Sequence, residues 1–335
     1  MVAAALWSSC KPDPAIEPSK DIVFSVPQGW PAPVYNFENN PLTQEGFALG
    51  RKLFFDTRLS RTNTISCGSC HQPFSAFAQL DHPISHGVED KLGTRNSPPL
   101  FNLNWHTSFF WDGGVNHIEV QPLSPIQNPV EMDEKLDNII AKLSADEDYA
   151  RRFTAVYGNK TITSQRMFKA IAQFMGMLVS ANSKYDKYIR GEAGGALNED
   201  ELNGLRVFKT NCATCHKEPL FSDFSFRNNG LPPTVVNDSG RAHITLAATD
   251  LYKFKIPSLR NLAYSAPYMH DGRFTTIDQV LDHYAQGIKP SATLDPLLAD
   301  GIPLSVQERK DLKAFLAALN DEAFVKDGRF QQPVE

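Results

Sequence analysis

The sequence CGSCH at residues 67–71 recurs as CATCH at residues 212–216. Both stretches match the pattern C-x-x-C-H, which is the attachment sequence of a c-type haem. Two thiols about one helical turn apart can form thioethers to the two vinyl groups of a haem, and the adjacent histidine then lies under the iron. We therefore expect two covalent c-type haems, one held by Cys67, Cys70 and His71 and the other by Cys212, Cys215 and His216.

The chain contains five cysteines, of which the two motifs use four. This pattern excludes a disulfide framework and leaves Cys10 as the odd cysteine. Two other kinds of site also use paired cysteines. In a zinc site of the Cys2His2 type the thiols would be metal ligands, and a thioredoxin-like redox pair would follow a strand.

Each motif is preceded by the same kind of predicted helix. In both helices, apolar residues recur at a period of about 3.6 after a residue suited to the N-cap, and a glycine stands four residues before a phenylalanine. The residues concerned are Thr43, Gly50 and Phe54 before the first motif and Asn198, Gly204 and Phe208 before the second. We interpret this similarity as an internal duplication.

The composition, with 41% hydrophobic and 21% charged residues, is that of an ordinary globular protein, and 335 residues are enough for two domains. The apolar helical pattern from Ser164 to Ser180 suits a helix buried between domains, and GEAGGAL at 191–197 suits a hinge. Alternating β-branched residues are scarce, so we predict an all-α fold of two cytochrome c-like domains, one c-type haem in each, with long functional loops. The expected divisions are an export remnant with a Pro-rich segment at 1–40, a first haem domain at 41–190 and a second at 191–335.

Charge and the N-terminal segment bear on partners and location. A net charge of −5, with Lys and Arg residues scattered along the chain, argues against nucleic acid as a partner. No stretch reaches the roughly 18 consecutive apolar residues of a transmembrane helix, so no membrane span is expected. MVAAALWSSC at 1–10 is similar to the end of a lipoprotein export signal, which predicts a periplasmic protein with a lipid anchor at Cys10. The alternative is an ordinary frayed N-terminus with a spare cysteine.

Four further segments give the chain a specific resemblance. They read RNSPPLFN at 95–102, FWDGG at 110–114, QPLSPIQNPVEM at 121–132 and PSLRNLAYSAPYMHDGRF at 257–274. Together with the two motifs, they resemble the bacterial dihaem cytochrome c peroxidase family, which includes MauG, over most of residues 40–325. The resemblance implies that the first domain reduces hydrogen peroxide to water and that the second domain receives electrons from a small periplasmic cytochrome c or cupredoxin. It also suggests a homodimer.

The same resemblance implies roles for three residues near the first haem. Glu131 matches the acid–base carboxylate, which can move a proton from the inner to the outer oxygen of peroxide. Gln121 matches the distal amide, which can hydrogen-bond peroxide or water. Trp111 matches an aromatic residue that lies between the two haems. The alternatives are a solvated loop carboxylate for Glu131 and ordinary core packing for Trp111.

The resemblance also implies metal ligands on the loops. Asn96 matches the side-chain ligand of an interdomain calcium ion, whose other protein ligands are the backbone carbonyls of Ser265 and Pro267. A structural loop asparagine is the alternative. His86 matches a histidine that closes the first iron in the resting state of many relatives, although it stands further from Asn96 than in their pattern. His82 and solvent are the alternatives for that position.

At the second haem the chain departs from the usual pattern of the family. Where many relatives have a methionine as sixth ligand, TIDQVLDHYAQ at 276–286 contains Tyr284 and no methionine. A phenolate favours ferric iron, which suggests a MauG-like member, and Met269, His270 and His283 are the alternative ligands. Two other functions therefore stay open: a MauG-like oxidase that acts on a partner protein, and a dihaem cytochrome that only transfers electrons.

Overall fold

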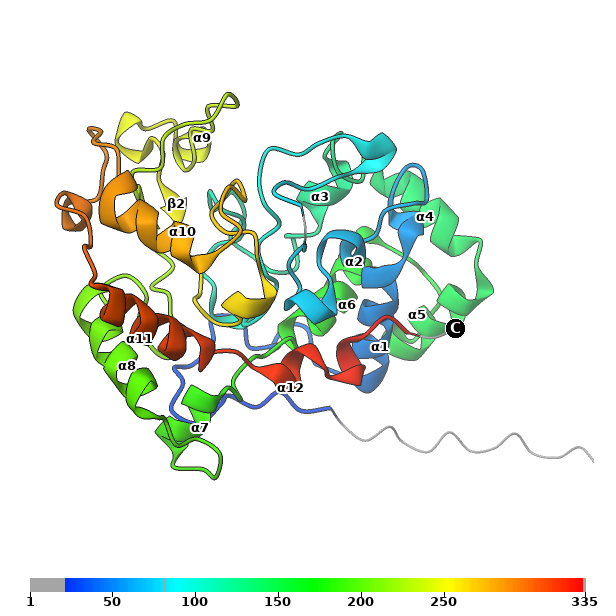
Figure 1. Cartoon of the computed structure of the whole chain (residues 1–335). Coiled ribbons are helices and arrows are strands. Elements are labelled where there is room, and N and C mark those ends of the chain that lie inside the picture. The colour runs from blue at the N-terminus through cyan, green and yellow to red at the C-terminus, as the bar shows by residue number, and fades with distance from the viewer. Residues whose placement is uncertain (1–21, 81, 334–335) are drawn as a thin grey trace, which may run out of the picture.

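The structure is a computed structural model that describes residues 22–80 and 82–333. Cys10 and the predicted export segment lie outside the described residues. The described chain is helix-rich and has one short antiparallel strand pair, so the prediction of a helical fold is confirmed at this level. Its elements are α1 Gln44–Phe55, α2 Cys67–Cys70, α3 Leu123–Gln127, α4 Leu136–Ser144, α5 Glu147–Tyr157, α6 Ser164–Gly176, α7 Lys184–Arg190, α8 Glu199–Asn211, α9 Ala242–Thr245, α10 Ile277–Asp282, α11 Val306–Ala317, α12 Glu322–Val325, β1 Phe226–Arg227 and β2 Phe254–Lys255 (Figure 1).

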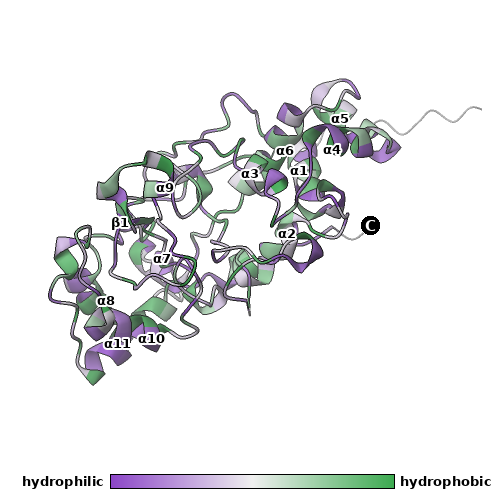
Figure 2. Ribbon diagram, turned by 90° about the horizontal axis from the view of Figure 1, so that it is seen from above, coloured by the Kyte–Doolittle hydropathy of each residue, from purple (hydrophilic) through white to green (hydrophobic). Residues whose placement is uncertain are grey.

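The buried apolar side chains form two clusters, one around α1 and α6 and the other around α8 and α11. We call the parts that carry the first and second C-x-x-C-H motifs the first half and the second half. Figure 2 shows them from above as two lobes. Near the C-terminus, Phe324 and Val325 of α12 pack into the first cluster, so the chain returns from the second half to the first. The predicted domain boundary at residues 190 and 191 stays a prediction. None of the described helices is long and apolar enough to cross a membrane.

Both halves are built on the same crossing of two helices. α1 packs against α6, and α8 packs against α11. At each crossing a glycine lets two backbones touch. A Cβ on Gly50 would overlap the carbonyl oxygen of Ala170, and a Cβ on Gly204 would overlap that of Asp311. The glycine found in both predicted helices therefore has the same structural reason in each half.

The predicted helices begin where expected, because Thr43 caps α1 and Asn198 caps α8. α6 is shorter than predicted and ends at Gly176 instead of Ser180. The reason is a long-range contact: the Ser180 N–H donates to Asn102 Oδ1 at 2.9 Å, and Asn102 Nδ2 donates to the Ser180 carbonyl at 3.1 Å. α6 also lies in the first cluster, and not between the halves as predicted.

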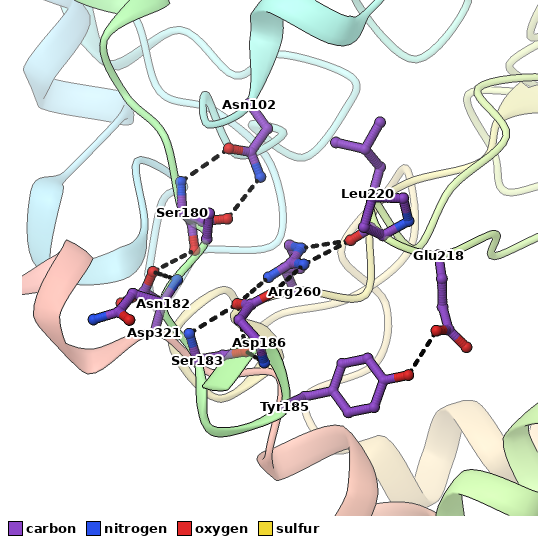
Figure 3. Close-up of polar contacts among 12 residues, drawn as sticks. Asn102, Ser180, Asn182, Ser183, Tyr185, Asp186, Glu218, Leu220, Arg260 and Asp321 are labelled. Atoms are coloured by element: carbon purple, nitrogen blue, oxygen red, sulfur yellow. Dashed lines mark hydrogen bonds and ion pairs between the residues drawn. The ribbon is translucent and has the colours of Figure 1, made fainter. Parts of the chain in front are cut away.

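Ser180 is also a point at which the two halves meet (Figure 3). Its hydroxyl donates to the Asp321 carboxylate at 3.3 Å and accepts from Asn261 Nδ2 at 2.9 Å. Nearby, the Arg260 guanidinium donates two hydrogen bonds of 2.8 Å to the Asp186 carboxylate. All of these side chains are buried. A buried polar network with its members hydrogen-bonded defines one geometry, so this junction fixes the halves relative to each other.

Two of the long loops repeat the same backbone conformation, although their amino acids differ. Residues 95–115 and 254–274 share several backbone features in the same order and at the same spacing. In each loop an asparagine in the left-handed region precedes a 3-10 turn, and a hairpin with further left-handed residues follows. The matched pairs are Asn102 with Asn261, Phe110 with Met269 and Gly113 with Gly272, all at positive φ, and the bridges Phe109–Val115 and Tyr268–Phe274.

Candidate active site

Each C-x-x-C-H motif places its histidine in the same way. His71 follows α2, and its Nδ1 lies 2.8 Å from the carbonyl oxygen of Phe77. His216 follows the C-terminal end of α8, and its Nδ1 lies 3.1 Å from the carbonyl oxygen of Phe221. Burial lowers the pKa of His71 to about 4 and also lowers the pKa of His216. Both rings are therefore neutral near pH 7, and a proton on Nδ1 leaves the Nε2 lone pair for a metal.

The cysteines beside these histidines fit covalent haem attachment. All four thiols of the motifs are free, and both pairs face cavities. In residues 22–80 and 82–333, no three or more His, Cys, Asp and Glu side chains group closely enough to hold a metal ion. The first motif follows a turn and the second follows a helix, which argues against a thioredoxin-like pair.

The first motif opens on a cavity of about 50 Å³. Besides the cysteines and His71, three of the predicted residues line this cavity from separate loops. They are His86, Gln121 and Glu131. Most of the other lining residues are apolar. The structure therefore brings together a neutral imidazole, an amide and a carboxyl group that lie up to sixty positions apart in the chain.

Glu131 is the only carboxylate among the residues that line this first cavity. Its Oε1 accepts a hydrogen bond of 2.7 Å from Asn128 Nδ2. Burial raises the pKa of Glu131, and the hydrogen bond from Asn128 opposes that rise. Gly87 packs against the backbone of Glu131 with no room for a Cβ, and the Val88 N–H donates to the Glu131 carbonyl at 2.7 Å. The loop that carries His86 therefore supports the loop that carries Glu131.

His86 is the histidine that this structure brings to the first cavity. Its Nδ1 lies 2.7 Å from the Asp90 carboxylate. His82 is exposed, does not line the cavity and contacts His86 edge-on, with 4.8 Å between the ring centroids. Of the two histidines considered for the first iron, His86 alone therefore stands on the cavity wall.

The second motif opens on a larger cavity of about 230 Å³ with mostly apolar lining. Tyr284, Met269 and His270 all line it together with His216. Three of the four candidate sixth ligands are thus on this wall. His283, the fourth candidate, is not among the lining residues.

Tyr284 and His283 point differently because adjacent residues on a helix are rotated by about 100°. Both belong to a π-helical turn at His283–Gly287, directly after α10. Such wide turns are frequent at functional sites. Burial raises the pKa of Tyr284, and a hydrogen bond with Asn229 opposes that rise. His283 is buried, and its Nε2 lies 3.0 Å from the carbonyl oxygen of Asn229. Asn229, which stands just after strand β1, therefore contacts both side chains.

Trp111 belongs to a loop of the first half but lines the second cavity. Its Nε1 donates to the carbonyl oxygen of Asn96 at 2.8 Å, and its own carbonyl accepts from the Lys255 N–H at 2.7 Å. The side chain is buried. Trp111 is therefore fixed by backbone groups of both halves.

The three predicted calcium ligands also line the second cavity. Asn96 is buried, and its Nδ2 donates to the carbonyl oxygen of Pro83 at 3.2 Å, which leaves the amide oxygen as the atom for a cation. Ser265 and Pro267 stand on the same wall. A set of oxygen donors without thiols or imidazoles suits calcium.

Sequence reasoning missed two side chains that contact the candidate residues. Asn128 binds Glu131, and Asn229 binds Tyr284. For Asn128 a signal existed, because an asparagine before a proline often begins a turn, and this one stands three residues before Glu131. For Asn229 no local signal existed, because its contact joins segments 55 positions apart in the chain.

Comparisons with known proteins agree with this geometry. The family model for the di-haem cytochrome c peroxidases matches residues 44–194. A methylamine utilization protein MauG from Methylorubrum extorquens is 36% identical over 307 residues, which cover 89% of this chain and 84% of that protein. A cytochrome c551 peroxidase from Nitrosomonas europaea is 36% identical over 241 residues, which cover 70% of this chain and 71% of that protein.

Among solved structures, a MauG-like protein associated with microbial copper homeostasis matches with a TM-score of 0.86 and 33% sequence identity. The match covers 93% of this chain and 99% of that chain. Fold, motifs and sequence similarity therefore agree over nearly the whole length. The chain belongs to the di-haem cytochrome c peroxidase family, a family of oxidoreductases whose membership implies two c-type haems.

Proposed function

We propose that this protein reduces hydrogen peroxide to water in its first half, with electrons that a small periplasmic donor protein, a cytochrome c or a cupredoxin, delivers to its second half. The observation that carries the proposal is the shared cavity of His71, Gln121 and Glu131. A cytochrome that only transfers electrons has no need of a carboxyl group and an amide at that place.

In the first half, Cys67 and Cys70 would hold the haem by thioethers and His71 would bind its iron. The bound haem supplies the iron at which peroxide is reduced. The overall reaction takes one peroxide, two electrons and two protons to two waters. Glu131 accepts a proton from one peroxide oxygen and returns it to the other, so that the O–O bond breaks with water as the leaving group. Gln121 orients the peroxide by a hydrogen bond.

Burial raises the pKa of Glu131, and a higher pKa makes the carboxylate a stronger proton acceptor. Asn128 holds one carboxylate oxygen, which fixes the direction of the other. His86 closes this site in the resting state and leaves before peroxide enters. The place of His86 on the cavity wall and the hydrogen bond between its Nδ1 and the Asp90 carboxylate support this role.

In the second half, Cys212, Cys215 and His216 would hold the second haem, with Tyr284 as the sixth ligand. Trp111 would serve as a path for electrons between the two haems, and its place on the wall of the second cavity supports this role. A calcium ion held by Asn96, Ser265 and Pro267 stabilises the loops of that path. The proposal includes a periplasmic location and a homodimer, as the resemblance implies.

A second function is favoured by one observation, the place of Tyr284 on the wall of the second cavity. A phenolate ligand favours higher oxidation states of iron. The second half would then store oxidising equivalents and withdraw electrons from residues of a partner protein. This is the MauG-like alternative, and it uses the same first half.

The test is to mix peroxide with the purified protein and to count electrons. We expect two electrons taken from a reduced small cytochrome or cupredoxin for each peroxide consumed. Consumption that proceeds with a protein substrate, and not with these donors, would instead support the MauG-like alternative. No consumption with any electron source would leave only an electron-transfer role and contradict the proposal.

A further inference from the structure

Lys255 is an unusual side chain for its position, because it is buried in the region between the two halves. It is 9% exposed and lines the second cavity. Its Nζ donates a hydrogen bond of 2.7 Å to the carbonyl oxygen of Ser108, in the loop that leads to Trp111. A lysine in the second half thus holds a loop of the first half.

The surroundings of this amine contain no directly paired carboxylate among the described residues. Its other neighbour is His106, whose Nδ1 lies 3.4 Å from Nζ. Burial and the charge of Lys255 lower the pKa of His106 well below its ordinary value, so that ring is neutral and can accept. Asp112 acts only from a distance, and its carboxylate binds Arg95 at 2.5 Å. Burial lowers the pKa of Lys255 to about 7, and Asp112 opposes that effect.

Because the two long loops repeat each other, Lys255 has a corresponding residue in the first half. In residues 95–115 and 254–274, Lys255 occupies the position that corresponds to Asn96. The two backbones also make reciprocal hydrogen bonds, from the Asn96 N–H to the His270 carbonyl and from the Lys255 N–H to the Trp111 carbonyl, both at 2.7 Å. His270 corresponds in turn to Trp111.

The residues around Lys255 and around the predicted calcium ion also correspond. Ser108, which accepts from Lys255 Nζ, corresponds to Pro267, whose carbonyl is assigned to the calcium ion under the proposed function. His106 likewise corresponds to Ser265. The ammonium of Lys255 therefore contacts the carbonyl oxygen of Ser108 and the ring of His106, which are the residues that correspond to Pro267 and Ser265.

We infer that Lys255 is a positioning residue whose ammonium group supplies a positive charge to the wall of the second cavity, at the position where the related loop would use a bound cation, and that it holds Trp111 through Ser108. This inference rests on the proposed function, because it concerns the haem that His216 would bind. A buried cation near an iron centre favours the reduced form, since reduction lowers the positive charge there. Lys255 therefore raises the affinity of the second half for an electron.

The test compares three substitutions in the holoprotein. Lys255→Met removes the charge and the donor, Lys255→Gln removes the charge and keeps a donor on a shorter side chain, and Lys255→Arg keeps both. Lys253→Met is the control, because Lys253 lies two positions away and pairs with Asp250 near the surface. The readout is the ferrous-to-ferric ratio of the second haem at a fixed ambient potential and pH 6, followed by the EPR signal of the ferric low-spin haem. At pH 6 the amine is protonated.

We expect the ratio to fall about ten-fold in both Lys255→Met and Lys255→Gln, which corresponds to about 59 mV for a one-electron couple. Lys255→Arg and Lys253→Met should stay close to wild type. A Lys255→Gln protein with the wild-type ratio would overturn the inference, because a hydrogen bond alone would then account for the residue. Haem content separates the two proposals: a wild-type protein with fewer than two covalent haems contradicts the proposed function, whatever Lys255 does.

Discussion

The first half and the second half share a helix crossing at a glycine, a C-x-x-C-H turn and a histidine that donates from Nδ1 to a backbone carbonyl. Their cavities differ. The first is about 50 Å³ and is lined by a carboxyl group, an amide and a second imidazole, whereas the second is about 230 Å³ and mostly apolar, with a tyrosine on its wall. The parts that would attach a haem are alike in the two halves, and the side chains that line the two cavities differ. We therefore expect chemical differences between the halves to depend on the loops that line their cavities.

The largest effect should come from removing one attachment site at a time. Cys67→Ala with Cys70→Ala, and Cys212→Ala with Cys215→Ala, should each reduce the covalent haem content from two to one, measured by intact mass after acid extraction. The first variant should lose peroxide reduction completely. The second should lose turnover with a protein donor and still consume peroxide after chemical reduction. Equal behaviour of the two variants would contradict a division of roles between the halves.

A smaller effect tests whether the scaffold is the same in both halves. A Cβ on Gly50 or on Gly204 would overlap a backbone carbonyl of the crossing helix, so either glycine-to-alanine change should cost about 1–3 kcal/mol of unfolding free energy. Denaturant titration measures this cost. Gly328→Ala is the control, because nothing lies within 4 Å of its added Cβ. If only one crossing were sensitive, the two halves would not share their packing.

A still more local effect is expected at the second haem. Tyr284→Phe removes the phenolate oxygen and keeps the ring, so the EPR signal and reduction potential of the second haem should change, and those of the first should not. Covalent haem content should stay at two. A sulfur-to-iron charge-transfer band in the wild-type protein would instead identify a methionine ligand, with Met269 on the same wall as the candidate.

The smallest effect concerns the pH dependence of the first half. Glu131 must be ionised to accept a proton, so turnover should fall as pH drops through its pKa, which burial raises above the ordinary value. The hydrogen bond from Asn128 stabilises the ionised form. Asn128→Ala should therefore raise that pKa further and move the acid limb of the pH–rate profile to higher pH. Asn138→Ala, which affects Glu134 instead, should leave the limb in place.

The sequence predicted the parts of the molecule that depend on local patterns. The N-caps Thr43 and Asn198 are found where the local pattern put them. His86, Gln121 and Glu131 line one cavity, and their roles stay predictions. The end of α6 was wrong, because Asn102 takes the backbone groups of Ser180 from 78 positions away. No periodicity within α6 could reveal such a contact.

The polar partners of the candidate residues were harder to predict for the same reason. Lys255 reaches Ser108 across 147 positions, and its buried place depends on how the halves meet. The repeat of residues 95–115 in 254–274 was also hidden, because its paired positions hold different amino acids, such as Trp111 and His270. Shared left-handed φ angles and bridges reveal it, and these are properties of the folded backbone.

The central claim is that the first half reduces peroxide with Glu131 as its proton carrier, and steady-state peroxide turnover of Glu131→Gln tests it most directly. The amide keeps the size of the side chain but cannot carry the proton. We predict a loss of roughly 10²–10⁴-fold with both haems retained, and wild-type turnover in Glu147→Gln, an exposed carboxylate of the same half. Near-wild-type turnover in Glu131→Gln with intact haems would contradict the account.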